Sequence, residues 1–184
     1  GSIGSALTGT YGQLTIAANG SYSYVANQAA ADALDAGDIV TDSFNYTVSD
    51  GTATDTAVIT ITVIGINDTP TAQNDVGVIV EDGTLTVANS ANATLTGTYD
   101  ATGENSGDLI DTSSSSHTDS DSDASASLSI TQIKKSGGSN SAVGIGSSYN
   151  SSGTQVTGTY GTLTIGADGS YTYAATQDAA DPLD

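Results

Sequence analysis

The sequence contains no cysteine, arginine, tryptophan or methionine, and only two of its 184 residues carry a basic side chain. Without cysteine, disulfides and zinc-thiolate sites are excluded. The scarcity of basic side chains argues against nucleic acid as a partner, because binding phosphates requires Lys or Arg. The longest apolar run, "AVITITVIGI", is far shorter than the roughly 20 residues of a membrane helix. We therefore expect no membrane insertion.

The chain is rich in acidic side chains, which number 21 and give a formal net charge of -19. Only Glu81 and Glu104 are glutamate, and all the other acids are Asp, which is preferred in turns and in loops that bind hard cations. The apolar residues are mostly Val, Ile, Leu, Ala and Tyr, set among many Thr and Ser. Side chains of this kind favour strands. The composition predicts an all-β protein that attracts cations.

One segment of 27 residues occurs twice in the sequence, with small differences. "GTYGQLTIAANGSYSYVANQAAADALD" begins at Gly9, and "GTYGTLTIGADGSYTYAATQDAADPLD" begins at Gly158, so that 19 of 27 residues are identical at an offset of 149. In both copies, apolar residues alternate on either side of an Asn-Gly or Asp-Gly pair. This pattern predicts a β-hairpin with a two-residue turn. A copied hairpin indicates a repeat protein.

The rest of the chain predicts one short helical stretch and several further strands. We expect helical turns in 27–38 and a linker at "GINDTP", 65–70. Two strands should surround the Asp50-Gly51 turn, with alternate residues facing inward: Phe44, Tyr46, Val48, Ala57, Ile59, Ile61 and Val63. Further strands are predicted at 75–80, 83–88, 93–99 and 127–133, with a long loop at 136–153.

The repeat period also predicts the domain organisation. If a unit begins at Thr69 and spans 149 residues, the next boundary falls beyond Asp184. We therefore expect 1–68 to be the C-terminal part of one β-sandwich repeat and 69–184 the N-terminal part of the next, both incomplete. The predicted fold is all-β, with tandem antiparallel β-sandwich modules.

Residues 7–70, the stretch "NDVGVIVEDGTLTVA" at 74–88 and the second "GTYGTLTIGADGSYTY" resemble the VCBS repeats of large bacterial surface adhesins. These repeats are similar to cadherin-like and immunoglobulin-like modules. The resemblance implies an extracellular protein, at the cell surface or in a secreted matrix, that acts in adhesion or biofilm formation. It also implies Ca²⁺ as the ion that stiffens the array.

The clearest candidate for Ca²⁺ is "TDSDSDAS", in which Asp119, Asp121 and Asp123 alternate. In a loop, alternate carboxylates can converge on an ion that takes 6–8 oxygen ligands. A solvated Ser/Asp linker is the alternative, since the Gly and distal Glu of an EF-hand are missing. By resemblance to cadherin-like junctions, a second group of candidates surrounds the linker: Asn67, Asp68, Asp75, Glu81 and Asp82. The Asp82-Gly83 pair is explained equally well as a turn.

No reaction is predicted for this chain. His117 lies in a Ser-rich loop, which is a poor scaffold for a catalytic triad, and the Asp residues lack the burial that a glycosidase acid needs. We expect a structural repeat whose partners are neighbouring repeats or identical chains, joined through sheet edges, with surface glycans or matrix as further candidates. The alternative is a filament or surface-layer subunit assembled by β-strand complementation between chains. A carbohydrate-binding module is a third hypothesis, against which the lack of Trp counts.

Overall fold

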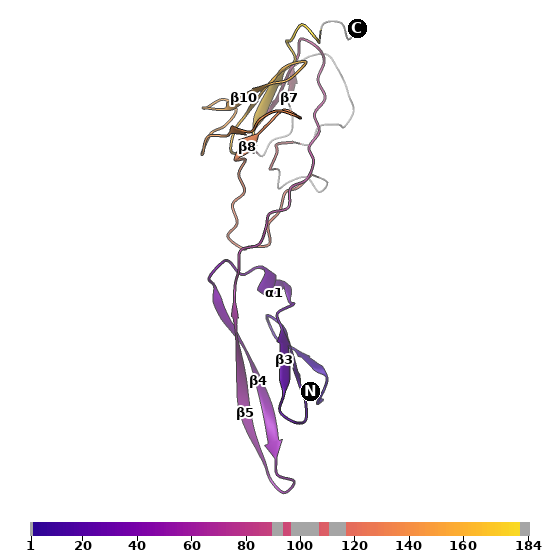
Figure 1. Cartoon of the computed structure of the whole chain (residues 1–184), viewed down its shortest axis with the longest axis vertical. Coiled ribbons are helices and arrows are strands. Elements are labelled where there is room, and N and C mark those ends of the chain that lie inside the picture. Colours follow the sequence, from indigo (N-terminus) through magenta and orange to yellow (C-terminus); the bar gives the residue numbers. More distant parts are fainter. Residues whose placement is uncertain (1, 90–93, 97–106, 111–116, 181–184) are drawn as a thin grey trace. The chain divides into compact units, whose positions relative to one another are not determined.

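The computed structural model describes residues 2–89, 94–96, 107–110 and 117–180, and within these ranges nearly every regular element is a strand (Figure 1). The chain divides into two compact units. The first comprises Gly1–Thr69 with Asp121–Ala126, and the second comprises Pro70–Ser120 with Ser127–Asp184. The predicted division by repeat period, at 68 and 69, is a property of the sequence and stays a prediction. The fold class is all-β and antiparallel, as predicted.

The first layer of the first unit is an antiparallel sheet of β1 (Ala6–Thr8), β2 (Gln13–Ile16) and β3 (Tyr22–Val25), in that order. Leu14 lies opposite Tyr24, and Ile16 lies opposite Tyr22. Residues directly opposite each other share a face of a sheet, so all four side chains project to one side. The predicted hairpin is confirmed.

The turn of this hairpin differs from the predicted two-residue turn. Ala17 N–H donates to the Ser21 carbonyl at 2.8 Å, which leaves three residues in the loop. Gly20 alone takes a positive φ there, 86°, so the loop is a turn closed by a left-handed glycine. Asn19 instead accepts hydrogen bonds from Ser21 through its side chain. The second copy repeats this arrangement, with Gly169 at φ 83°.

The second layer of the first unit is a hairpin of β4 (Ile39–Ser49) and β5 (Thr54–Ile64), which follows the short helix α1 (Ala29–Asp32). The two strands pair along their whole length. Phe44 is buried, and its ring meets Tyr24 of the first layer edge-on at 6.4 Å between centroids. The predicted inward residues of β5 are indeed its half-buried ones: Ala57, Ile59, Ile61 and Val63. The first unit is therefore a β-sandwich.

The second unit contains a five-stranded antiparallel sheet in the order β10-β11-β12-β6-β7. Its strands are β6 (Thr84–Val87), β7 (Thr94–Thr96), β10 (Thr154–Thr157), β11 (Thr162–Ile165) and β12 (Tyr171–Ala174). A small pair, β8 (Gln132–Ile133) and β9 (Ser141–Ala142), lies outside it. The core of this unit gathers residues from the sheet and from the long loop: Leu85, Val87, Val143, Ile165, Ala167 and Tyr171.

Two of the predicted strands are wrong. Residues 75–80 form no strand, and of 127–133 only β8 is extended and paired. Both segments carry β-favouring residues, but a strand also needs a neighbour to satisfy its backbone groups, and local propensity does not supply one. The predicted strand at 83–88 is confirmed as β6. In 93–99 the structure describes only β7, and the rest of that prediction lies outside the described residues.

Candidate functional site

The acidic loop predicted to bind Ca²⁺ lies against the segment that follows the linker. In the second unit, Asp119 Oδ1 accepts the Gln73 N–H at 2.7 Å. Thr71 and Ser120 exchange two backbone hydrogen bonds, of 2.8 and 3.0 Å. His117 Nδ1 lies 2.6 Å from the Asn74 carbonyl oxygen. The first carboxylate of the series is therefore fixed by a residue 46 positions away in the chain.

The later part of the same loop belongs to the first unit. Asp123 Oδ2 accepts the Asp68 N–H at 3.1 Å, and Asp121 Oδ1 accepts the Asp123 N–H at 2.9 Å. The Ser125 N–H donates to Asp35 Oδ1 at 2.9 Å. The hydrogen bond from the Ser125 side chain, followed by the one from its N–H, holds the pKa of Asp35 below its usual value. The second oxygen of Asp123, Oδ1, is buried and has no hydrogen-bond partner.

The remaining metal candidates lie in different surroundings. Asn67 Nδ2 donates to the Asp68 carbonyl, beside Asp123. Glu81 and Asp82 form the turn before β6, where Asp82 adopts φ 57° and donates its N–H to Ala175. Within the described parts of the chain, no three acidic or histidine side chains are grouped so that they could hold one ion. The metal assignment stays a prediction.

Asp75, the other candidate, lies near a buried tyrosine of the second core. Burial, followed by the charges of Asp75 and Asp108, raises the pKa of Tyr171 to about 12. Asp108 is itself buried, and its Oδ1 accepts the Ile110 N–H at 3.0 Å. The sequence analysis did not single out Asp108, because nothing in its local pattern distinguishes it from the many exposed Asp residues.

A second carboxylate site, in the first unit, was also missed. Asp42 on β4 is only 4% exposed, and it accepts hydrogen bonds from the loop between β1 and β2. The donors are the N–H groups of Thr10, Tyr11 and Gly12, at 2.9, 3.0 and 3.2 Å, and the Tyr24 hydroxyl at 2.6 Å. A loop whose successive N–H groups point to one place is a natural anion site. We call this loop, residues 9–12, the GTYG loop.

The GTYG loop leaves no room for a larger first residue. A Cβ on Gly9 would lie 2.3 Å from Asp42 Oδ2, so glycine is required for the carboxylate to approach the backbone. The sequence held a signal for this site. Asp42 occupies the same alternation position as Phe44 and Tyr46, and so it is a charged residue on an inward face. A buried charge needs partners, and the repeated "GTYG" supplies them.

Opposing effects act on the Asp42 carboxyl. Burial raises its pKa, but the hydrogen bonds from Tyr24 and from the GTYG loop together outweigh burial, so that the pKa lies below its usual value. Burial is the largest cause that raises the pKa of Tyr24, and the hydrogen bond to Asp42 and the charge of Asp42 add to it. Together they raise the pKa of Tyr24 to about 12. The pair is therefore charged at Asp42 and neutral at Tyr24 over the whole physiological range.

Comparison with known protein families gives a match in the first unit. Residues 2–65 match the family profile of a bacterial cadherin-like domain. The matched range covers the two-layered β-sandwich of β1 to β5 and ends just before the "INDTP" segment of the linker. No curated protein sequence matches the chain. In the described residues, no helix is long and apolar enough to cross a membrane.

Proposed function

We propose that this chain is a non-catalytic structural or adhesive segment of a bacterial extracellular protein, at the cell surface or in a secreted matrix, built from tandem β-sandwich repeats. The observation that carries the proposal is the cadherin-like match over 2–65, combined with the return of the same hairpin 149 residues later. Cadherin-like domains serve as repeated spacers and contact modules. A second hairpin of the same kind indicates that this chain carries more than one such module.

The location can be tested on the bacterium that makes the protein. Antibodies raised against the purified chain should label intact cells or their matrix, and brief protease treatment of intact cells should remove the label. Labelling that appears only after the cells are lysed would contradict an extracellular role. A cytoplasmic protein probed in parallel controls for cell integrity.

We further propose that Ca²⁺ binds the acidic loop. The oxygen chemistry of the loop suits a hard cation, and Asp123 Oδ1, which is buried without a hydrogen-bond partner, is the kind of atom that a cation satisfies. Asp119, Asp121 and Asp123 each accept a backbone N–H through one carboxylate oxygen. The second oxygen of each is the one proposed to bind the ion. Because no group of three acids is assembled in the described residues, an ion here would also take carbonyl oxygens or water.

Calcium should therefore stabilise the chain. At a Ca²⁺ concentration one hundred times Kd, the linkage relation gives about 2.7 kcal/mol of added stability, which is measured as a rise in Tm relative to the same sample with EGTA. Changing Asp119, Asp121 and Asp123 together to Asn should abolish this rise. A matched control removes the same charge from exposed positions elsewhere: Asp32, Asp55 and Asp178. The control variant should show the same rise in Tm as the unmodified chain. If the unmodified chain has the same Tm with Ca²⁺ and with EGTA, the calcium proposal is wrong.

A further inference from the structure

The two copies of the hairpin have different neighbours. In the second unit, β12 pairs with β11 on one side and with β6 on the other. In the first unit, β3, the counterpart of β12, pairs with β2 alone. Among the residues that the structure describes, no strand lies along the outer edge of β3. Two similar sequences, YTYA and YSYV, thus form an interior strand in the second unit and an edge strand in the first.

The hydrogen bonding of the hairpin shows which groups face outward. Ala17 N–H donates to Ser21 O, and antiparallel ladders alternate, so Ser23 and Val25 bond to β2. The N–H and C=O groups of Tyr22 and Tyr24 therefore point away from the sheet. In the second unit, Ala175 N–H donates to Gly83 O at 3.0 Å, and the same alternation makes Tyr173 and Tyr171 bond to β6. The groups that bond to β6 in one copy are those left open in the other.

Side-chain burial follows the same division. Tyr171, which lies opposite Val87 of β6, is 6% exposed, whereas its counterpart Tyr22 is 59% exposed. Ile165 is fully buried, whereas Ile16 is only half-buried. Because these pairs occupy equivalent positions in equivalent hairpins, the difference comes from what covers them. β6 supplies Leu85 and Val87 to the core of the second unit.

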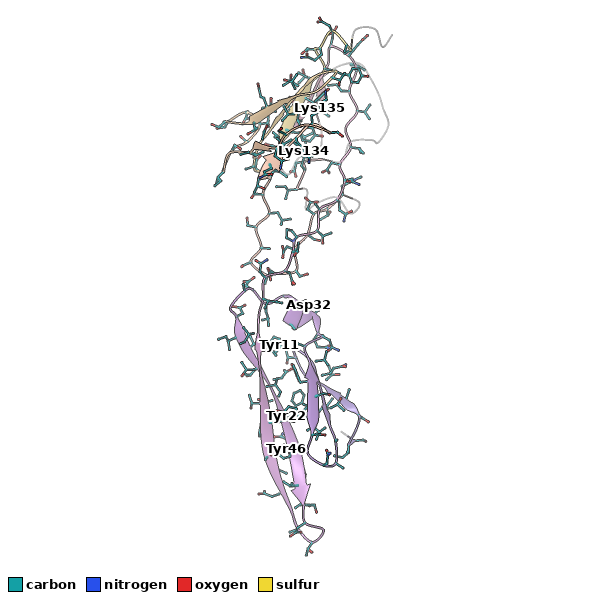
Figure 2. The ribbon with its side chains drawn as sticks, viewed as in Figure 1. Tyr11, Tyr22, Asp32, Tyr46, Lys134 and Lys135 are labelled. Atoms are coloured by element: carbon teal, nitrogen blue, oxygen red, sulfur yellow. The ribbon has the colours of Figure 1, made fainter. Side chains whose placement is uncertain are left out.

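An open groove of about 620 Å³ lies at the uncovered end of the first hairpin, between the two layers of the sandwich. Figure 2 shows Tyr22 and Tyr46 in this part of the first unit, and both side chains are exposed. Strands β1, β2 and β4 contribute six of the apolar residues that line the groove: Leu7, Leu14, Ile16, Phe44, Tyr46 and Val48. Side chains at the β6 positions would project to the same side of the sheet as Leu14 and Ile16.

We propose that the outer edge of β3 is a docking surface for a β6-type strand, an extended Thr-Leu-Thr-Val segment contributed by another repeat of the same kind. The register follows from the second unit: Tyr22 opposite Val, Ser23 opposite Thr, Tyr24 opposite Leu and Val25 opposite Thr. The docked strand completes the ladder through Tyr22 and Tyr24 and projects its Leu and Val to the sheet face that carries Leu14 and Ile16. This inference does not depend on Ca²⁺ or on the location proposed above.

One substitution between the copies limits what else can occupy the surface. Gly166 is packed so tightly that a Cβ would lie 2.3 Å from Ser148 Cα and 2.7 Å from the Ser147 carbonyl. The first copy has Ala17 at this position, so it carries the Cβ that such a loop could not accommodate. A loop like 147–148 therefore cannot approach the first hairpin as closely. The strand position beside β3 is unaffected, since it involves Tyr22 and Tyr24.

A peptide of residues 80–89, VEDGTLTVAN, tests the proposal against the full chain. Hydrogen exchange measured by NMR should show slower exchange at the Tyr22 and Tyr24 amides, by about tenfold at a free peptide concentration nine times Kd. The amides of Ser23 and Val25, which already bond to β2, should change far less. Saturable protection confined to Tyr22 and Tyr24 supports the docking surface, and unchanged exchange at millimolar peptide overturns it.

Backbone methylation of the peptide provides a matched pair of controls. N-methylation at Leu85 or Val87 removes a hydrogen bond that the register directs to β3, and should abolish protection. N-methylation at Thr86 modifies an amide that faces the opposite side, as it faces β7 in the chain, and should leave binding nearly intact. Equal binding of all three peptides would overturn edge pairing, because simple apolar adsorption does not distinguish these amides.

A disulfide trap tests the register. The chain has no cysteine, so Ser23→Cys creates a single thiol, to be mixed with a peptide carrying Thr86→Cys. Their counterparts Thr172 and Thr86 face each other with hydroxyl oxygens 3.2 Å apart. With the peptide thiol activated as a mixed disulfide with 5-thio-2-nitrobenzoate, the thiolate of the Ser23→Cys chain should displace 5-thio-2-nitrobenzoate readily and form the cross-link. Val25→Cys is the matched control, displaced by two residues on the same face, and should be trapped poorly. Trapping that is no faster at Ser23 than at Val25 contradicts the register.

Discussion

Replacing Asp42 with alanine should destabilise the first unit by about 3–5 kcal/mol, a large share of the stability of a small domain. The substitution leaves the GTYG-loop amides and the Tyr24 hydroxyl without their common acceptor. Each buried donor left unsatisfied costs roughly 1–3 kcal/mol. Because Thr10 and Tyr11 are not fully buried, water can replace part of the loss, which keeps the total below the sum of separate penalties.

Urea unfolding monitored by hydrogen exchange in each unit measures this effect separately for the two units. Asp55→Ala is the matched control, since Asp55 is exposed and lies on the partner strand β5, and it should cost less than about 0.5 kcal/mol. Asp42→Asn should still be strongly destabilising, because its NH₂ group would face the N–H donors of the loop. An Asp42→Ala chain as stable as the control would show that the GTYG loop does not depend on the carboxylate.

The same site predicts how stability depends on pH. The pKa of Asp42 in the folded chain lies below its value in the unfolded chain, so its contribution is present above about pH 4 and is lost as the pH falls through the folded pKa. Tyr24 affects stability at high pH. Its pKa is raised to about 12, so its contribution is present below about pH 10 and is lost as the pH rises toward 12. In Asp42→Ala, the first of these losses should be smaller than in the unmodified chain.

The fold could be predicted from the sequence where the signals are local. Strand alternation and the glycine of the hairpin loop both act within a few residues, and they located both hairpin copies and the inward face of β5. The same signals were wrong at 75–80 and at most of 127–133, because no local pattern reveals whether a partner strand exists. The two-residue turn was wrong for a related reason, since Asn19 satisfies its loop through its side chain and not through a positive φ.

The carboxylate sites show the same limit more clearly. The spacing of Asp119, Asp121 and Asp123 was visible, but the partners Gln73 and Asp68 lie 46 and 55 positions from the residues they bond to. Asp42 and the GTYG loop are about 30 positions apart. Such pairings depend on how the layers fold together. A charged residue on an inward strand face is nevertheless visible in a sequence, and it predicts that the fold supplies hydrogen-bond partners for the charge.

The largest contrast between the two copies is expected from isoleucine truncation. Ile165→Ala removes a fully buried side chain from the second core and should cost about 2–5 kcal/mol, whereas Ile16→Ala removes a half-buried one and should cost roughly 1 kcal/mol. Two residues earlier on the same strands, β2 and β11, the order reverses. Leu14 is 1% exposed and Leu163 is half-buried, so Leu14→Ala should be the more costly of the two.

These four variants compare identical substitutions at equivalent positions of two similar hairpins that have different neighbours. Hydrogen exchange in each unit gives the four free energies of unfolding, and each copy of the hairpin serves as the control for the other. If Ile16→Ala and Ile165→Ala cost the same, the hairpin would derive its stability from its own strands and not from its neighbours. The opposite result, large costs at Leu14 and Ile165 and small ones at Ile16 and Leu163, means that each unit buries a different end of the same hairpin. Adding the β6 peptide should then raise the cost of Ile16→Ala specifically, because a docked strand would cover that side chain as β6 covers Ile165.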